Sequence, residues 1–181
     1  MTYSEFAKRA RIPLGFLLGI SYLIWARPTL RTLLVGGAIA LVGVLVRAWA
    51  SGHIYKNEQL ATSGPYAHTR NPLYFGSFLI AAGFALAAHW SLLVAVTVFF
   101  GVIYYPTMQR EVGNIQSRFP DAYLKYAGNV PLFFPRPTPW RGDIGSANRF
   151  QPALYMKHGE WKAGLTYVLA MIWLAFRVFH P

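Results

Sequence analysis

The stretch that decides the fold is Gly64-Pro65-Tyr66-Ala67-His68-Thr69-Arg70-Asn71-Pro72-Leu73-Tyr74-Phe75-Gly76, a polar segment between two long apolar runs. Placing polar side chains next to membrane-spanning segments is unfavourable in free energy, so such side chains usually belong to a functional site. Turn-forming pairs at each end bracket a short connection, and Pro72 opens the following apolar helix, where its missing N–H costs nothing. A helix N-terminus beside the cation Arg70 is suited to hold a carboxylate. The sequence therefore predicts a ligand site in this segment.

The composition favours an all-α integral membrane protein. Of the 181 residues, 55% are hydrophobic and only 13% are charged, and the mean hydropathy is +0.32. The chain has no cysteine, which excludes disulfides, thiolate metal sites and a cysteine nucleophile. The net charge of +11 could indicate nucleic-acid binding, but the basic residues lie between apolar segments and form no separate domain. The charge is therefore interpreted as membrane topology, with no nucleic-acid partner.

About five transmembrane helices are expected in a single membrane domain, 1–181. The predicted spans are 12–26, 30–50, 73–88, 91–105 and 161–179. About twenty apolar residues are needed to cross a bilayer. The second and fifth segments are long enough to do so, whereas the other three need their flanking turns to complete the crossing. The first span follows basic residues as a signal peptide would, but Trp25-Ala26-Arg27-Pro28 offers no small-residue cleavage site, so we expect a retained helix.

The basic residues also predict an orientation. With the N-terminus in the cytoplasm, all of the 17 basic residues except Arg27, Arg31 and Arg177 fall on the cytoplasmic side. The positive-inside rule favours this arrangement. An odd number of spans then places the C-terminus outside, and we expect the active site to face the cytoplasm, in a bacterial inner membrane.

Two cytoplasmic segments, 51–72 and 106–160, are too long for simple turns. Apolar residues recur every three to four positions over 107–127, as in an amphipathic helix. Pro120 lies inside that pattern and predicts a break into two helices, with Asp121 near the start of the second. The proline-rich segment Pro131–Trp140 is expected to be extended and to lie along the membrane surface. We expect a site where the two segments meet.

Taken one at a time, Arg70 and Glu111 each allow two interpretations. Arg70 suits bidentate binding of a carboxylate or phosphate, or it is a positive-inside anchor. Glu111 suits a ligand amine or ribose hydroxyls, or it pairs with Arg110 or Arg118 on a solvated helix face.

Histidines and tyrosines are equally open. His53 and His68 are candidate bases or ligands, yet no pair has the His-x-x-x-His spacing of a metal site, so no metal is predicted. Four tyrosines either line a site or form an interfacial belt: Tyr66, Tyr74, Tyr123 and Tyr126. There is no Gly-x-Gly-x-x-Gly motif, P-loop or Gly-x-Ser-x-Gly motif.

Taken together, the motifs resemble the isoprenylcysteine carboxyl methyltransferase and phospholipid methyltransferase family. The first family block, Gly-x-Tyr-x-x-x-Arg-His-Pro-x-Tyr-x-Gly, corresponds to 64–76, with Asn71 where the family has histidine. The second, Glu-Glu-x-x-Leu followed by Phe-Gly-x-x-Tyr-x-x-Tyr, corresponds to Glu111–Ile115 and 119–126, with Val112 replacing the second carboxylate. The resemblance covers about Arg47 to Pro135, half the chain, and a helical hairpin joins the two blocks as in the family.

The resemblance implies a membrane enzyme that uses S-adenosylmethionine without a Rossmann domain. The cofactor-binding residues that it implies are Gln59, Leu60, Ala61, Tyr66, Arg70, Asn71, Pro72, Leu73, Tyr74 and Glu111. Candidate catalytic side chains are Arg70, Glu111 and Tyr126. The expected reaction is methyl transfer to a lipophilic acceptor that enters from the inner leaflet. An isoprenylcysteine-like carboxylate, a lipid and a hydrophobic small molecule all remain open.

Two alternatives differ in class. Membrane sterol reductases carry a comparable Arg-His-Pro-like block and use NADPH, although they are usually longer. A non-catalytic membrane protein, such as a transporter or assembly partner, would be expected to carry intramembrane charges, and Arg47 is the only strong candidate. Arg47 lies near the cytoplasmic end of its span, where it can also extend its side chain to the interface.

Overall fold

A computed structural model describes residues 3–55, 59–142 and 149–180, with only the backbone described at 3–8 and 11. Every regular element in this part of the chain is helical, which confirms the predicted all-α class. The elements are α1 (Tyr3–Trp25), α2 (Leu30–Ser51), the 3-10 helix η1 (Gly64–Ala67), α3 (Pro72–Ala88), α4 (Trp90–Phe99), the π-helical turn η2 (Phe100–Tyr104), α5 (Tyr105–Arg118), α6 (Pro120–Ala127), α7 (Pro152–His158) and α8 (Trp161–Phe179).

Apolar helices occupy all five predicted spans. Three are long and apolar enough to cross a bilayer: Leu30–Ser51, the continuous helix Trp90–Arg118, and Trp161–Phe179. The other two, Ile12–Trp25 and Pro72–Ala88, are apolar but shorter. Large hydrophobic side chains such as Phe16, Leu34 and Ile172 are more than half exposed on these helices. An apolar outer surface of this extent suits contact with lipid, and the protein is an all-α membrane protein.

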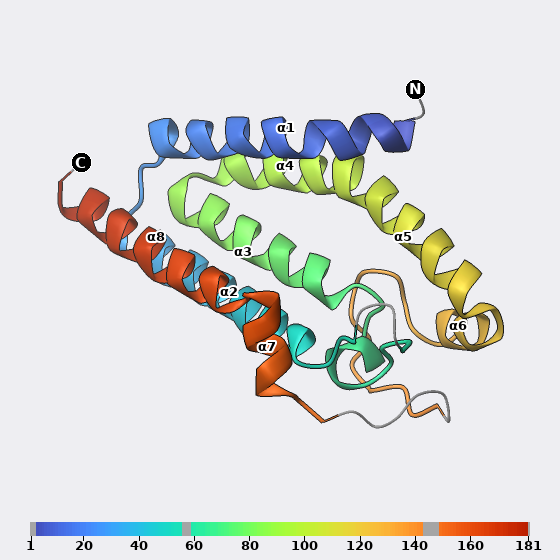
Figure 1. The fold of residues 1–181 in the computed structure, drawn as a ribbon. Coiled ribbons are helices and arrows are strands. Elements are labelled where there is room, and N and C mark those ends of the chain that lie inside the picture. The colour runs from blue at the N-terminus through green and yellow to red at the C-terminus, as the bar shows by residue number, and fades with distance from the viewer. Residues whose placement is uncertain (1–2, 56–58, 143–148, 181) are drawn as a thin grey trace.

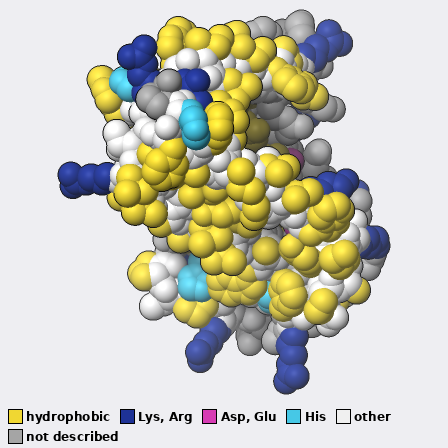
Figure 2. Space-filling model, turned by 90° about the vertical axis from the view of Figure 1, so that its left-hand side faces the viewer, with side chains coloured by type: hydrophobic (Ala, Val, Ile, Leu, Met, Phe, Trp, Pro, Cys, Tyr) yellow, Lys and Arg dark blue, Asp and Glu magenta, His cyan; other side chains and the backbone are white. Residues whose placement is uncertain are grey.

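The helices run roughly side by side (Figure 1). α1 lies along α4, α2 pairs with α3, and α8 packs against α2. Leu174 of α8 is fully buried in a core cluster with residues of α3 and α4. The N- and C-terminal ends of the described chain lie at opposite ends of the molecule, and α5 and α6 gather at the end away from the C-terminus (Figure 1). Seen from the left-hand side of Figure 1, the surface is largely hydrophobic, with lysines and arginines around its margin (Figure 2).

Glycines allow α2 and α3 to approach closely. Gly36 and Gly43 on α2 face Gly83 and Gly76 on α3, and a Cβ at Gly36 would lie 2.3 Å from the Gly83 carbonyl oxygen. A Cβ at Gly43 would lie 2.6 Å from the Gly76 carbonyl oxygen. Small residues at such contacts are typical of membrane helix pairs, where close backbone packing drives association. This pair fixes where the 52–71 loop begins and ends.

The helix of the fourth predicted span, 91–105, continues beyond Tyr105. One helix runs from Trp90 to Arg118, and Pro106 lies inside it. A proline ring clashes with the carbonyl four residues earlier in a regular α-helix, but here the wider turn η2, Phe100–Tyr104, precedes Pro106. A π-helical turn accommodates an irregularity without ending a helix. The helix boundary expected at Pro106 is therefore absent, and α5 extends directly from α4.

The helix break at Pro120 is confirmed. α5 ends at Arg118, α6 begins at Pro120, and Asp121 lies in the first turn of α6. The following segment, Pro131–Trp140, forms no regular helix, and its chain bends at 132–134 and 137–138. Helix α7 was not predicted. Lys56 of the positive-inside pattern lies outside the described residues.

Candidate active site

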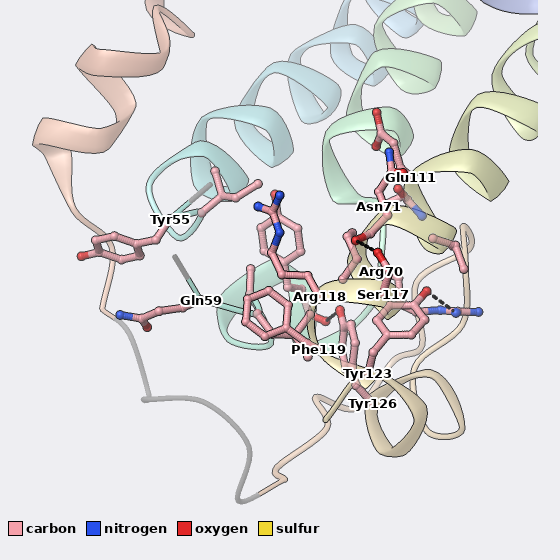
Figure 3. A pocket seen from close by; sticks show the side chains of 17 residues that line it. Tyr55, Gln59, Arg70, Asn71, Glu111, Ser117, Arg118, Phe119, Tyr123 and Tyr126 are labelled. Atoms are coloured by element: carbon pink, nitrogen blue, oxygen red, sulfur yellow. Dashed lines mark hydrogen bonds between the residues drawn. The ribbon is translucent and has the colours of Figure 1, made fainter. Parts of the chain in front are cut away.

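A cavity of about 560 Å³ lies at the end of the α2–α3 hairpin, between the 52–71 loop and helices α5 and α6 (Figure 3). Eight predicted site residues line it: Gln59, Leu60, Ala61, Tyr66, Arg70, Asn71, Glu111 and Tyr126. The two segments 51–72 and 106–160 therefore meet, as expected. Whether these side chains bind a cofactor remains a prediction.

Three other predicted residues, Pro72, Leu73 and Tyr74, form the first turn of α3 behind the cavity wall. Five further residues line the cavity that the sequence analysis did not assign to the site: Ile54, Tyr55, Asn114, Ser117 and Arg118. Arg118 was considered there only as an ion-pair partner of Glu111. A helical signal could have identified three of them, because Asn114 and Arg118 follow Glu111 at spacings of three and seven on α5, and Ser117 adjoins that face.

Tyr66 and Tyr126 form the buried floor of the cavity. The Tyr126 hydroxyl donates a 2.6 Å hydrogen bond to the backbone carbonyl of Tyr66, and both side chains are almost fully buried. Burial raises the pKa of both phenols above their ordinary value, and for Tyr66 the nearby carboxylates of Glu111 and Glu160 add to this increase in pKa. Both groups are therefore neutral at physiological pH.

Arg70 lies where α6 meets the 52–71 loop. One guanidinium nitrogen, Nη1, donates a 2.8 Å hydrogen bond to the Tyr123 hydroxyl, and the guanidinium carbon lies 5.8 Å from the Tyr123 ring centre. The Nε atom of Arg70 is buried and has no hydrogen-bond partner within the described part of the chain. A buried donor without a partner is costly, so Arg70 keeps part of its hydrogen-bonding capacity unused beside the cavity that its side chain lines.

Glu111 is held by α3. The Tyr74 hydroxyl donates a 2.8 Å hydrogen bond to Oε1 of Glu111, and the Glu111 side chain is otherwise exposed at the cavity. Tyr74 therefore contributes to the site through Glu111 without lining the cavity. The two residues come from the first turn of α3 and from α5, so this contact joins the two sequence blocks.

The proline-rich segment Pro131–Trp140 holds the loop in place. The Arg70 N–H donates to the Pro131 carbonyl at 2.9 Å, and the Asn71 side-chain nitrogen donates to the Leu132 carbonyl at 3.0 Å. The Trp140 N–H donates to the Ala67 carbonyl at 2.9 Å. These contacts pair the segment with the loop, and its expected position along the membrane surface stays a prediction. Asn71, at the position of the family histidine, thus uses its amide to fix the loop.

The two candidate histidines are engaged in backbone contacts. His53 is buried and its Nδ1 lies 2.9 Å from the Trp49 carbonyl, whereas Nδ1 of His68 lies 2.8 Å from the Arg136 carbonyl. Carbonyl oxygens only accept hydrogen bonds, so both Nδ1 atoms are donors. Across residues 3–55, 59–142 and 149–180, no group of three or more His, Asp or Glu side chains could hold a metal ion.

An apolar helical bundle with a polar, ligand-sized cavity at one end defines a membrane protein with a candidate binding site. The phospholipid methyltransferase family model matches residues 34–120, which include both sequence blocks as far as Pro120. The chain belongs to the phospholipid methyltransferase family, so the predicted resemblance is confirmed and the protein is assigned to a class of membrane methyltransferases.

Two curated relatives are similar over much of the chain. The cobalt-zinc-cadmium resistance protein CzcN of Cupriavidus metallidurans is 34% identical over 123 residues, which are 66% of this chain and 55% of that protein. The nickel-cobalt-cadmium resistance protein NccN of Alcaligenes xylosoxydans xylosoxydans is 30% identical over 161 residues, 83% of this chain and 71% of that protein. The chain thus spans about half the length of the first relative. No solved structure matches the chain significantly.

Proposed function

We propose that the protein transfers a methyl group from S-adenosylmethionine to a lipophilic acceptor that reaches the cavity from the membrane. The observation that carries this proposal is the cavity of about 560 Å³ that brings Arg70 and Glu111 together beside buried tyrosines. Ligand pockets commonly have volumes of about 300 to 1,000 Å³. The cavity lies mostly within the region that matches the methyltransferase family.

The side chains around the cavity fit the polar groups of this cofactor. The Arg70 side chain, which lines the cavity, and the positive start of α3 suit the methionine carboxylate. Glu111, which is exposed at the cavity, suits the amine or the ribose hydroxyls. Tyr66 and Tyr126 supply a buried, neutral wall for the uncharged parts of the ligand.

A sulfonium cofactor supplies an already activated methyl group, so the protein has to orient the acceptor and exclude water. The raised pKa of Tyr126, due mainly to burial, and its hydrogen bond to Tyr66 keep its proton in place, so Tyr126 would not act as a base. Glu111 is the candidate proton acceptor, because its carboxylate lies at the cavity. An acceptor that is already nucleophilic, such as a carboxylate or thiolate, requires no base at all.

The orientation in the membrane is part of the same proposal: N-terminus in the cytoplasm, C-terminus outside, and the cavity facing the cytoplasm of a bacterial inner membrane. Because the chain has no cysteine, single cysteines can be introduced without background. A cysteine at Ser91 should react with an impermeant maleimide in intact cells. One at Lys125 should react only in inverted vesicles, and the opposite pattern would reverse the topology.

The decisive experiment is calorimetric titration of detergent-purified protein with S-adenosylhomocysteine and, separately, with NADPH. Micromolar binding of S-adenosylhomocysteine alone would support the methyltransferase cofactor, and incubation with methyl-labelled S-adenosylmethionine and lipid extracts would then identify the acceptor class. Binding of NADPH alone would favour a reductase. Binding of neither by folded protein would favour a non-catalytic membrane protein.

The names of the two relatives favour a second, compatible role in resistance to divalent metals such as cobalt and cadmium. We propose that such a role would depend on methyl transfer. Cells that express the wild-type chain should grow at higher cobalt or cadmium concentrations than cells that express Glu111→Gln. If the wild-type chain and Glu111→Gln protected cells equally, metal resistance would not depend on the cavity.

A further inference from the structure

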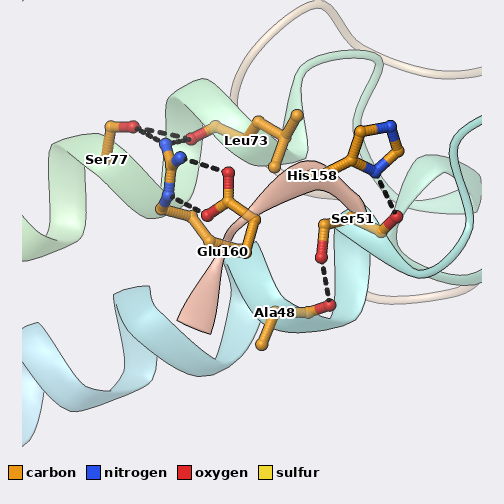
Figure 4. A network of polar contacts seen from close by, with 7 residues as sticks. Ala48, Ser51, Leu73, Ser77, His158 and Glu160 are labelled. Atoms are coloured by element: carbon orange, nitrogen blue, oxygen red, sulfur yellow. Dashed lines mark hydrogen bonds and ion pairs between the residues drawn. The ribbon is translucent and has the colours of Figure 1, made fainter. Parts of the chain in front are cut away.

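Arg47 has a network of contacts that its position near the end of α2 did not predict. Its partners Leu73, Ser77 and Glu160 are labelled in Figure 4. Its Nε and Nη2 atoms donate to the two carboxylate oxygens of Glu160 at 2.9 and 2.6 Å. Its Nη1 atom donates to the Leu73 carbonyl at 3.3 Å and also to the Ser77 hydroxyl. All three guanidinium nitrogens are therefore engaged, and Arg47 does not simply extend toward the interface.

These contacts connect three separate parts of the chain. Arg47 belongs to α2, Leu73 and Ser77 belong to the first turns of α3, and Glu160 directly precedes α8. The Arg47 and Glu160 side chains are only 25% and 13% exposed. A bidentate pair with this little exposure fixes side-chain orientation more strongly than a surface ion pair.

The Arg47 contact holds the backbone that carries the site. Leu73 lies next to Tyr74, whose hydroxyl donates to Glu111, and two residues from Asn71, which lines the cavity. The Arg47 side chain also requires the glycine of the first sequence block, since a Cβ at Gly76 would lie 2.7 Å from Cγ of Arg47. The conformation of Arg47 and the first turn of α3 are thus mutually dependent.

Glu160 lies outside the region that matches the family model, 34–120. The C-terminal helices nevertheless contact the end of α2 at further points. Nδ1 of His158 lies 3.1 Å from the Ser51 carbonyl, and the Gln151 N–H donates to the Gly52 carbonyl at 2.9 Å. These contacts place α7 and α8 where Glu160 can determine the orientation of Arg47.

We propose that Arg47 and Glu160 are positioning residues, through which the C-terminal helix α8 sets the first turn of α3 and hence Tyr74 and Glu111 at the cavity. The proposal rests on the proposed function where it predicts an effect on cofactor binding. Neither side chain lines the cavity, so the pair acts through α3 without contact with the ligand.

The test uses an apolar replacement that removes the pair without leaving a buried charge. Replacing a buried ion pair by apolar residues of similar size is often neutral for stability, whereas removing one partner is strongly destabilising. The double variant Arg47→Met/Glu160→Leu should therefore unfold near the wild-type temperature while lacking the donor to Leu73. Glu160→Asp retains the charge, and Asp121→Asn is a matched control that removes an exposed carboxylate from α6.

Two readouts are measured on full-length protein: amide hydrogen exchange over residues 73–77 without ligand, and affinity for S-adenosylhomocysteine. Loss of one charge-assisted hydrogen bond corresponds to a change of about tenfold or more. We expect the double variant to exchange about tenfold faster over this turn and to bind about tenfold more weakly. Glu160→Asp should recover part of both effects, and Asp121→Asn should match the wild type.

Wild-type exchange and affinity in the double variant would overturn the proposal and leave the pair a purely structural contact. If the double variant does not fold, Arg47→Lys is compared with Glu160→Asp, because lysine keeps the charge but cannot reach Glu160 and the Leu73 carbonyl through one rigid planar group. Failure of the proposed function can be told apart from failure of the positioning role. In the first case the wild-type protein would not bind S-adenosylhomocysteine. The exchange measurement needs no ligand and would still decide whether the pair positions the first turn of α3.

Discussion

The hydroxyl of Tyr126 donates a 2.6 Å hydrogen bond to the backbone carbonyl of Tyr66, and this contact joins α6 to the 3-10 helix η1 at the floor of the cavity. The two residues are 60 positions apart in the chain. Tyr126 also packs at 5.5 Å between ring centres against Trp140 of the proline-rich segment. One side chain thus connects three segments that surround the cavity.

Tyr126→Phe should therefore destabilise the protein. The substitution keeps the ring but leaves the buried Tyr66 carbonyl without this donor, which typically costs about 1 to 3 kcal/mol. Thermal unfolding in detergent should show a lower midpoint than for the wild type. Tyr105→Phe is the matched control, because Tyr105 is 52% exposed, and an equal decrease in both variants would contradict a specific role for the Tyr126–Tyr66 contact.

The stability should also depend on Tyr66 and Tyr126 at high pH. Burial raises the pKa of both phenols above the ordinary value of about 10. Below that pH both the folded and unfolded states are protonated, so the stabilisation is fully present. Above it the unfolded phenols ionise first, and stability should fall by up to about 1.4 kcal/mol per pH unit for each. Unfolding midpoints between pH 8 and 11 should decline less steeply for Tyr126→Phe than for wild type or Tyr105→Phe.

Substitution of Glu111 or Tyr66 should weaken cofactor binding. Glu111→Ala removes a carboxylate from the cavity, and Tyr66→Ala removes part of its buried floor. Losing a hydrogen bond to a charged group costs about 1.5 to 3 kcal/mol, which is roughly a tenfold to hundredfold loss of affinity. Calorimetry with S-adenosylhomocysteine measures this directly. Normal affinity in both variants would refute the site assignment.

Arg70→Lys should impair binding even though it preserves the charge. A lysine cannot donate to the Tyr123 hydroxyl and to a carboxylate through one rigid planar group, as arginine can. We expect the affinity for S-adenosylhomocysteine to fall by about tenfold, the equivalent of one hydrogen bond. Arg110→Lys, on the exposed surface of α5, is the control and should bind normally. If both variants retained wild-type affinity, Arg70 would be a topological anchor only.

Gly83→Ala should disrupt the pairing of α2 and α3. The new Cβ would lie 2.5 Å from both the Ala40 nitrogen and the Gly36 carbonyl oxygen, and backbone atoms cannot move aside locally. Overpacking of this kind typically costs about 1 to 3 kcal/mol. Gly164→Ala on α8 places its Cβ in open space and should be neutral or stabilising. Comparable unfolding midpoints for the two variants would show that α2 and α3 separate easily.

Much of the fold could be predicted from the backbone preferences of individual residues. Pro72 at the start of α3 and Pro120 at the break between α5 and α6 act through their own backbone restrictions, which are visible in the sequence. The continuity of α4 and α5 was not predictable in the same way. Pro106 normally indicates a helix boundary, and only the π-helical turn before it explains why the helix continues.

The site was predictable in part, for a different reason. Glu111 and Tyr66 stand in motifs whose pairing indicates a shared cavity, so the sequence could place them together. The contact between Arg47 and Glu160 spans 113 positions, and no local pattern relates the two residues. Asn71 likewise shows no sign in the sequence that its amide reaches Leu132. Such contacts depend on how distant segments pack, which periodicity and spacing do not encode.

The pairing of the 64–71 loop with Pro131–Trp140 has a consequence for biogenesis. The ribosome completes the loop about sixty residues before the segment that pairs with it, and the α3–α4 hairpin is synthesised in between. Domains fold as their parts emerge, so the apolar helices can enter the bilayer while the loop still lacks its partners. A nascent chain released before Pro131 would carry these membrane helices without a completed cavity. The cavity is thus completed only after the α3–α4 hairpin has been synthesised.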